Sequence, residues 1–274
     1  MAPLKFDRIG AWTEIKLDII RKYAAAYSRI LSSRHFHHVY IDAFAGPGIH
    51  ISKKRMAMTA GSPVVALNID PPFKEYHFID LDGDKIEMLR KLIEIRPVAA
   101  HVHQGDCNQI LLEQIFPTVR YEHYRRALCL LDPYGLHLRW QVMETAGQLG
   151  TIDILLNFPV ADINRNVLWH QRDQVDPGDI ERMNAWWGDD SWRRIAYRTQ
   201  ATLFGEEQVR EAMAVVVEAF RRRLQQLAGF VHVPEPLPMR NSRGAVVYYL
   251  FFGSSNQTAA RIIADVFKPY RSRR

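Results

Sequence analysis

The stretch "YIDAFAGPGIH", Tyr40–His50, carries most of the fold prediction. An apolar run typical of a buried strand ends here at Asp42, and two glycines then bracket a proline. Glycine adopts positive φ angles and lets a ligand approach the backbone closely. In an open α/β sheet, ligands bind beyond the carboxyl ends of the strands. We therefore expect Gly46 and Gly48 to form the floor of a ligand site at the end of a strand.

Five apolar segments alternate with helical patterns in the first part of the chain. They are "HVYIDAFA", "EYHFIDLD", "AAHVHQGDCN", "RALCLLDPYG" and "IDILLNFP". Near the end, "FVHVPEPLPM" and "AVVYYLFFGS" flank the turn "NSRG" as an antiparallel hairpin. Strands that alternate with helices are typical of a parallel sheet covered on both faces. The sequence thus predicts an α/β protein with a doubly wound, mostly parallel seven-stranded sheet, an antiparallel terminal hairpin and a helical insertion.

Composition narrows the class of protein. The chain has 274 residues, 47% of them hydrophobic, which is enough for a full core. No apolar run approaches the ~20 residues that span a bilayer, and the N-terminus lacks an apolar signal segment, so we expect a cytoplasmic protein. The net charge of +6 weakly favours a polyanionic partner such as nucleic acid. Each basic cluster (Lys53–Arg55, Arg221–Arg223 and Arg271–Arg274) is as readily explained as solvated surface.

Acidic residues end four of the five predicted strands. Asp80 is placed to accept hydrogen bonds from a ribose diol, and Asp106 from an adenine amino group. Any one of these acids could be a turn or helix cap, whereas four aligned acids favour a nucleoside site. The predicted ligand-binding residues are these acids and their neighbours at the first three strand ends: Asp42, Phe44, Gly46, Gly48, Asp80, Leu81, Asp106 and Cys107.

The ligand is predicted to be S-adenosylmethionine rather than a dinucleotide. The dinucleotide fingerprint G-x-G-x-x-G is incomplete, because Ile51 occupies the third glycine position. A polar, basic segment also intervenes before the next helix start at Ser62–Pro63. A nucleoside with a compact, charged tail fits these features better than a pyrophosphate does.

The motifs together resemble those of class I methyltransferases, which have a Rossmann-like fold. More closely, "YIDAFAGPG", "GSP", "FIDLD", "GDCN", "LDPYGL", "NFP" and "NRN" resemble the three-Cys-motif partner family, over Trp12–Phe267. The resemblance implies a methyltransferase-like fold and a bacterial or mobile-element partner protein that bears a three-cysteine motif.

The segment Asp132-Pro133-Tyr134 resembles the D-P-P-Y motif of enzymes that methylate amino groups in nucleic acids. In that motif the acid and a backbone carbonyl accept hydrogen bonds from the exocyclic amine, and the aromatic ring stacks on an extruded base. This chain has one proline instead of two, so the match to the motif is partial. The alternative interpretation of this segment is a junction between a strand and a turn, without a catalytic role. We expect Asp132, Pro133 and Tyr134 to be the catalytic residues.

Residues after the fifth strand are predicted to cover the substrate. Asn157, Asp162, Asn164 and Arg165 are the predicted substrate-binding residues. Trp186, Trp187 and Trp192 could stack on a substrate or pack the insertion, and we interpret them as packing residues. We expect one helix across residues 206–227.

Neither the cysteines nor the histidines indicate a metal site. Two cysteines, Cys107 and Cys129, are too few for a zinc site or a disulfide framework, and both are interpreted as inert core residues. His35, His37 and His38 lack carboxylate companions, and we interpret them as surface residues.

We expect a single domain over residues 1–274. Its predicted parts are an N-terminal helical segment (1–38), a cofactor-binding core (39–159), a helical insertion or substrate cap (160–228), and a C-terminal hairpin and helix (229–274). The leading hypothesis is a methyltransferase that acts on an amino group of a nucleic-acid base and works with a three-Cys-motif protein. The alternatives are a non-catalytic scaffold with the same fold, and a methyltransferase for a small molecule or a protein.

Overall fold

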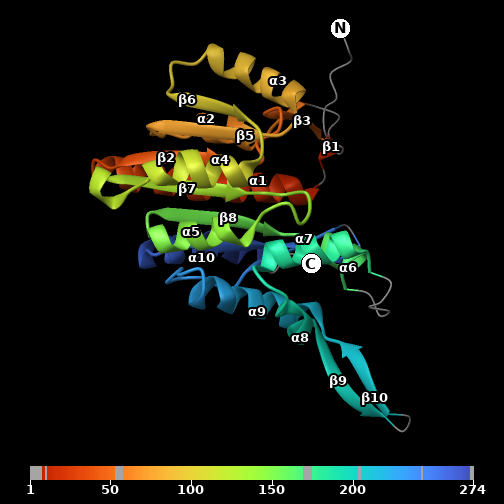
Figure 1. Ribbon diagram of the computed structural model, residues 1–274. Coiled ribbons are helices and arrows are strands. Elements are labelled where there is room, and N and C mark those ends of the chain that lie inside the picture. Colours follow the sequence, from red (N-terminus) through yellow and green to blue (C-terminus); the bar gives the residue numbers. More distant parts are fainter. Residues whose placement is uncertain are drawn as a thin grey trace.

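The computed structural model describes residues 8–9, 11–52, 58–168, 175–202, 205–241 and 243–271. Its centre is a seven-stranded sheet of order β11-β12-β8-β7-β2-β5-β6 (Figure 1). The strands are β2 (His37–Asp42), β5 (Glu75–Asp80), β6 (Ala100–Gln104), β7 (Arg125–Leu131), β8 (Ile152–Phe158), β11 (Leu237–Arg240) and β12 (Val246–Gly253). The pairs that join β6, β5, β2, β7 and β8 are parallel, whereas β12 is antiparallel to β8 and to β11. The predicted sheet, with its antiparallel terminal hairpin, is confirmed.

Helices cover both faces of this sheet. One face is packed by α1 (Ala11–Ser33), α2 (Ser62–Leu67), α3 (Gly83–Glu94) and α10 (Gln257–Arg271). The other is packed by α4 (Cys107–Ile110) with the π-helical η1 (Leu111–Ile115), α5 (Trp140–Leu149), α6 (Val160–Asn166), α7 (Pro177–Trp187), α8 (Trp192–Ala196) and α9 (Met213–Gln226). Two short 3₁₀ helices, η2 (Phe116–Thr118) and η3 (Tyr121–His123), precede β7. Among the described residues, no helix combines the length and the apolar character needed to cross a membrane.

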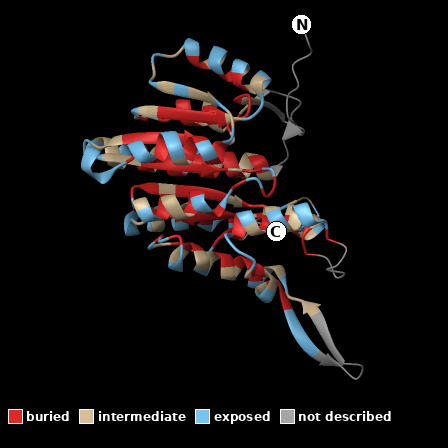
Figure 2. Ribbon diagram, viewed as in Figure 1, coloured by how far each residue is buried: buried red, intermediate tan, exposed pale blue. Residues whose placement is uncertain are grey.

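The central strands are buried from both sides, as Figure 2 shows. Side chains alternate between the two cores, so that Val39 and Ile41 enter one core and Tyr40 enters the other. This double burial explains why the strands have continuous apolar runs rather than alternating patterns. Trp186, Trp187 and Trp192 are at most 2% exposed, which confirms that they are packing residues.

The insertion after β8 contains a hairpin that the sequence pattern did not reveal. Strands β9 (Tyr197–Thr202) and β10 (Gly205–Arg210) pair antiparallel and project from the body (Figure 1). The prediction of one helix across residues 206–227 was wrong at its start, since α9 begins at Met213. Every residue of β10 has a partner on β9, and this pairing overrides the local helical preference.

A second small sheet follows the glycine turn. Strands β3 (Ile49–Ser52) and β4 (Met58–Ala60) form an antiparallel pair, and β1 (Arg8–Ile9) adds to β3. Ile51 therefore lies in a strand, where the dinucleotide fingerprint would require the start of a helix. The basic cluster Lys53–Arg55 and residues 272–274 of the C-terminal basic cluster lie outside the described residues.

One premise of the surface interpretation of the histidine tract was wrong for His37, which has a carboxylate companion, because its Nε2 lies 2.9 Å from Oε2 of Glu75. The surface interpretation itself was wrong for His38. This side chain is 0% exposed, and its Nε2 lies 2.9 Å from the hydroxyl of Ser28 on α1. The reason is that β2 begins at His37 and carries the next residue into the core.

Candidate active site

The glycine turn after β2 is tied to the end of β5. Gly46 and Gly48 have φ angles of 63° and 79°, in the region that favours glycine. The amide of Gly46 donates a hydrogen bond to Asp80 Oδ2 at 2.9 Å, and the amide of Asp82 donates to Asp80 Oδ1 at 2.9 Å. Two backbone groups thus fix the Asp80 carboxylate at the carboxyl edge of the sheet.

Two cavities meet at this edge. The Asp80 cavity, of about 870 Å³, lies at the ends of β2, β5 and β6 and includes Leu81, Asp106 and Cys107 in its lining. The Asp132 cavity, of about 460 Å³, lies beyond β7 and β8. Phe44 and Tyr134 line both cavities, so the two adjoin. The order of strands around β2 makes this the switch point of the sheet, where ligands of α/β proteins bind.

Acidic, basic and apolar side chains line the Asp80 cavity. Leu81 lines this cavity and is 74% exposed, so its side chain is accessible to a ligand. Asp106 caps α4, because its Oδ1 accepts hydrogen bonds from the amide of Asn108 at 2.9 Å and from its side chain at 2.8 Å. Its Oδ2 lies 3.9 Å from the guanidinium of Arg139. Asp106 therefore does cap a helix, which was the alternative interpretation of this acid. The cap uses only one of its two carboxylate oxygens.

The cysteines are held in their thiol form. Burial raises the pKa of Cys107 to about 12, and the nearby Asp106 carboxylate acts in the same direction. Burial raises the pKa of Cys129 well above its ordinary value. Because the thiolate is the reactive form, both residues lack nucleophilic character, in agreement with their interpretation as inert.

Asp132 is held at both of its oxygens. Oδ2 accepts a hydrogen bond from the ammonium of Lys16 on α1, and Oδ1 accepts one from the amide of Asn157 on β8 at 3.0 Å. The Asn157 amide also lies 3.4 Å from the carbonyl oxygen of Pro133. The side chains of Lys16 and Asp132 are 9% and 22% exposed, so this ion pair is largely shielded from water.

Asp42, which was predicted to bind the cofactor, is buried and is not among the residues that line the two cavities. Burial raises its pKa to about 7, and the neighbouring Asp132 carboxylate contributes in the same direction, while Ser62, the Phe44 amide and Lys16 oppose the shift. The Phe44 amide donates to its Oδ1 at 3.3 Å, and its Oδ2 has no hydrogen-bond partner among the described residues. The ionised form of Asp42 is therefore disfavoured at this end of the sheet.

Tyr134 stands at the boundary between the cavities. Its side chain is 76% exposed, and the ammonium of Lys85 lies 5.6 Å from the centre of its ring. Pro133 next to it is buried and fixes the direction of the loop. An exposed ring at this place offers a flat surface on which a planar group can stack.

The four predicted substrate-binding residues separate into two pairs. Asn157 and Asp162 line the Asp132 cavity, and Asp162 accepts a hydrogen bond from the Leu136 amide at 3.2 Å. Asn164 and Arg165 are outside the lining of both cavities, as far as the structure describes the chain. Asn164 instead accepts a hydrogen bond from Arg210 and so connects α6 to the β9–β10 hairpin.

Sequence reasoning missed Lys16, Trp12 and Tyr248, which complete the wall of the Asp132 cavity. A signal for Lys16 was present. This lysine precedes Ile19, Ile20 and Tyr23 by three, four and seven residues, and so lies on the apolar face of its helix. Within the described part of the chain, the structure has no group of three or more His, Cys, Asp or Glu side chains arranged to hold a metal ion.

No protein-family model and no curated protein matches this chain. Among solved structures, it is similar to protein LPL1258 from Legionella pneumophila, with a TM-score of 0.53 and 12% identity, over 93% of this chain and 91% of the other. An S-adenosylmethionine-dependent methyltransferase from Clostridium acetobutylicum gives a TM-score of 0.42 at 11% identity, over 86% and 92%. Trm1 from Pyrococcus horikoshii, in complex with S-adenosyl-L-methionine, gives 0.43 at 12%, over 92% of this chain and 58% of Trm1. The first of these similarities establishes a shared fold over nearly the whole of both chains.

Proposed function

We propose that the chain is an S-adenosylmethionine-dependent methyltransferase that binds its cofactor in the Asp80 cavity and its methyl acceptor in the Asp132 cavity. The observation that carries this proposal is the junction of the two cavities at Phe44 and Tyr134. Methyl transfer requires that donor and acceptor are aligned in one site that excludes water. Two adjoining cavities of about 870 Å³ and 460 Å³ provide room for both.

The residues of the Asp80 cavity suit a nucleoside. Asp80 would accept hydrogen bonds from the ribose hydroxyls, with the Gly46 and Asp82 amides keeping its carboxylate in place. Leu81 would offer an apolar contact to the adenine ring. When bound, the cofactor would supply a methyl group activated by the positive charge on sulfur.

Calorimetry with S-adenosylmethionine and S-adenosylhomocysteine tests the cofactor proposal. Asp80→Ala should weaken binding by about 1–3 kcal/mol, because the ribose and the two backbone amides would lose their acceptor. Glu94→Ala, at an exposed position of α3, is the matched control and should bind as the wild type does. A folded wild-type protein that binds neither compound at millimolar concentration would refute the proposal.

For the acceptor, we propose an amino group of a nucleic-acid base. Support comes from Asp132, whose carboxylate lines the cavity, and from the exposed ring of Tyr134 at its edge. Asp132 would accept a hydrogen bond from the amine. When the new C–N bond forms, the bond from the methyl carbon to sulfur would break and its electrons would stay on sulfur, while Asp132 would take up the proton that the nitrogen loses. Tyr134 would stack on the extruded base.

Transfer of a labelled methyl group to random-sequence DNA and RNA oligonucleotides tests the acceptor class. Binding of these oligonucleotides should weaken steeply as salt rises, because lysine and arginine contacts to phosphate release counterions. Binding that is independent of salt, together with label in protein or small molecules alone, would contradict a nucleic-acid acceptor.

A second candidate is a non-catalytic scaffold that presents or regulates a three-Cys-motif protein. One observation favours it, namely that Lys16 and Asn157 already engage both oxygens of Asp132. Co-purification with a three-Cys-motif protein, combined with cofactor binding but no methyl transfer to nucleic acid, protein or small molecules, would support the scaffold over the enzyme.

A further inference from the structure

Lys16 is a buried cation on α1. It is 7% exposed, on the face of α1 that packs against the sheet. Lysine is almost never buried to this extent unless it has a partner, and here the partner is Asp132, 116 positions away in the sequence. Lys22 on the same helix is exposed, and it pairs with Asp18 one turn away at 2.8 Å and with the hydroxyl of Tyr270 at 2.7 Å.

The contacts of Lys16 and Asn157 together fix the orientation of the Asp132 carboxylate. Lys16 binds Oδ2 and Asn157 binds Oδ1 at 3.0 Å, so rotation of the carboxylate about its last bond would break one or both contacts. The two partners come from different elements, α1 and β8. Groups that act on a developing charge are effective when they are held in place before the reaction.

Packing alone does not account for this ion pair. Two apolar side chains of similar size are often as stabilising as a buried ion pair, because the charges must be removed from water. The cation is therefore better explained by the carboxylate that it holds. We infer that Lys16 is a positioning residue of the Asp132 cavity, which together with Asn157 aims the Asp132 carboxylate at the methyl acceptor. This inference rests on the proposed function.

The first test compares three variants of the full chain. Lys16→Met removes the charge at similar length, Lys16→Arg keeps the charge, and Lys22→Met is the matched control on the same helix. The probe is transfer of labelled methyl from S-adenosylmethionine to a random-sequence oligonucleotide pool. We expect Lys16→Met to lower kcat at least tenfold, with KM for the pool and the cofactor Kd within about threefold of wild type. Lys16→Arg should recover most of the rate, and Lys22→Met should equal wild type.

The second test does not depend on activity. In crystals of each variant with S-adenosylhomocysteine, Asp132 should keep its contact with Asn157 in Lys16→Arg and Lys22→Met, and should change its side-chain rotamer in Lys16→Met. A Lys16→Met protein with Asp132 unmoved, or with an unchanged rate of transfer, would overturn the inference. If Lys16→Met does not fold, Lys16→Arg decides, because a role in positioning requires that arginine preserve the Asp132 rotamer. Wild-type protein that transfers no methyl group refutes the proposed function, while the rotamers still decide the role of Lys16.

Discussion

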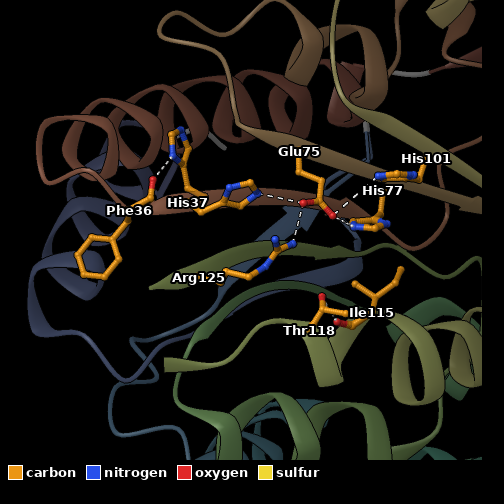
Figure 3. Close-up of polar contacts among 9 residues, drawn as sticks. Phe36, His37, Glu75, His77, His101, Ile115, Thr118 and Arg125 are labelled. Atoms are coloured by element: carbon orange, nitrogen blue, oxygen red, sulfur yellow. Dashed lines mark hydrogen bonds and ion pairs between the residues drawn. The ribbon is translucent and has the colours of Figure 1, made fainter. Parts of the chain in front are cut away.

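Each end of the sheet has a partly buried carboxylate with basic partners, but the two ends differ in how well the ionised acid is stabilised. At the amino end, Glu75 on β5 accepts hydrogen bonds from Arg125 at 2.7 Å, from His37 at 2.9 Å and from His77 at 2.8 Å. Figure 3 shows these side chains converging on the Glu75 carboxylate from neighbouring strands. Burial acts to raise the pKa of Glu75, but Arg125 and the two histidines outweigh it and lower the pKa to about 2.

At the carboxyl end, the ammonium of Lys16 lies near two acids. It binds Asp132, whereas the buried Asp42 nearby has one carboxylate oxygen without a hydrogen-bond partner in the described structure. Burial and the Asp132 charge raise the pKa of Asp42 to about 7. The partners of Glu75 thus favour its ionised form, whereas the surroundings of Asp42 disfavour ionisation.

Arg125→Met should produce the largest change, and it acts on stability. It leaves the shielded Glu75 carboxylate without its permanent cation, which typically costs about 3–5 kcal/mol for a buried pair. Urea unfolding measures the loss, and calorimetry should show unchanged cofactor binding at the opposite end. Arg90→Met, which removes an exposed pair with Glu87 on α3, should change stability by less than about 1 kcal/mol. If Arg125→Met lowers the free energy of unfolding no more than the control does, then the partly buried Glu75 carboxylate does not need Arg125 for stability.

Asp132→Ala should have its effect on catalysis. Removal of one preorganised charged group lowers kcat by about a hundredfold or more, equivalent to about 3 kcal/mol, because its contact develops in the transition state. Cofactor affinity should remain within about threefold of wild type. Labelled methyl transfer and calorimetry measure the two quantities, and Glu87→Ala, at an exposed ion pair with Arg90 on α3, serves as control. Full activity of Asp132→Ala would exclude the catalytic role, and an unfolded variant would identify Asp132 as a strand-junction residue.

The contrast between the two ends also explains what the sequence could and could not predict. Asp80 and Asp132 were predictable because each lies at the end of a buried strand, and the ends of parallel strands meet at one edge. The contact of Asp132 with Lys16 spans 116 positions and depends on how α1 packs, so no local pattern reports it. The same limit applies to the hairpin, where strand pairing rather than the sequence of residues 205–210 decides the structure. Asn164 followed the right strand, but its helix turns it toward Arg210 instead of a cavity.

The dependence of stability on pH should have opposite sign for Glu75 and Asp42. Glu75 has a folded-state pKa of about 2, below its ordinary value of 4.5, so its contribution is complete above pH 4.5 and is lost as pH falls toward 2. Asp42 has a folded-state pKa of about 7, above its ordinary value of 3.8. Between those two pH values the unfolded chain releases a proton that the folded chain retains. Rising pH therefore destabilises the fold through Asp42, with the full cost reached above pH 7.

Asp42→Asn should remove this cost and produce the smallest of the three effects. The amide oxygen can still accept the hydrogen bond from the Phe44 amide, while the buried side chain no longer ionises. We expect the variant to be about 2 kcal/mol more stable than wild type at pH 8, since one pKa unit corresponds to about 1.4 kcal/mol and the protein relaxes in part. The difference should shrink toward zero at pH 4, where Asp42 is protonated in the folded wild type. Urea unfolding at both pH values measures it, with the exposed Asp84→Asn on α3 as control. A variant that is less stable than wild type at pH 8 would show that the ionised Asp42 stabilises the fold, and the contrast between the two ends would then be wrong.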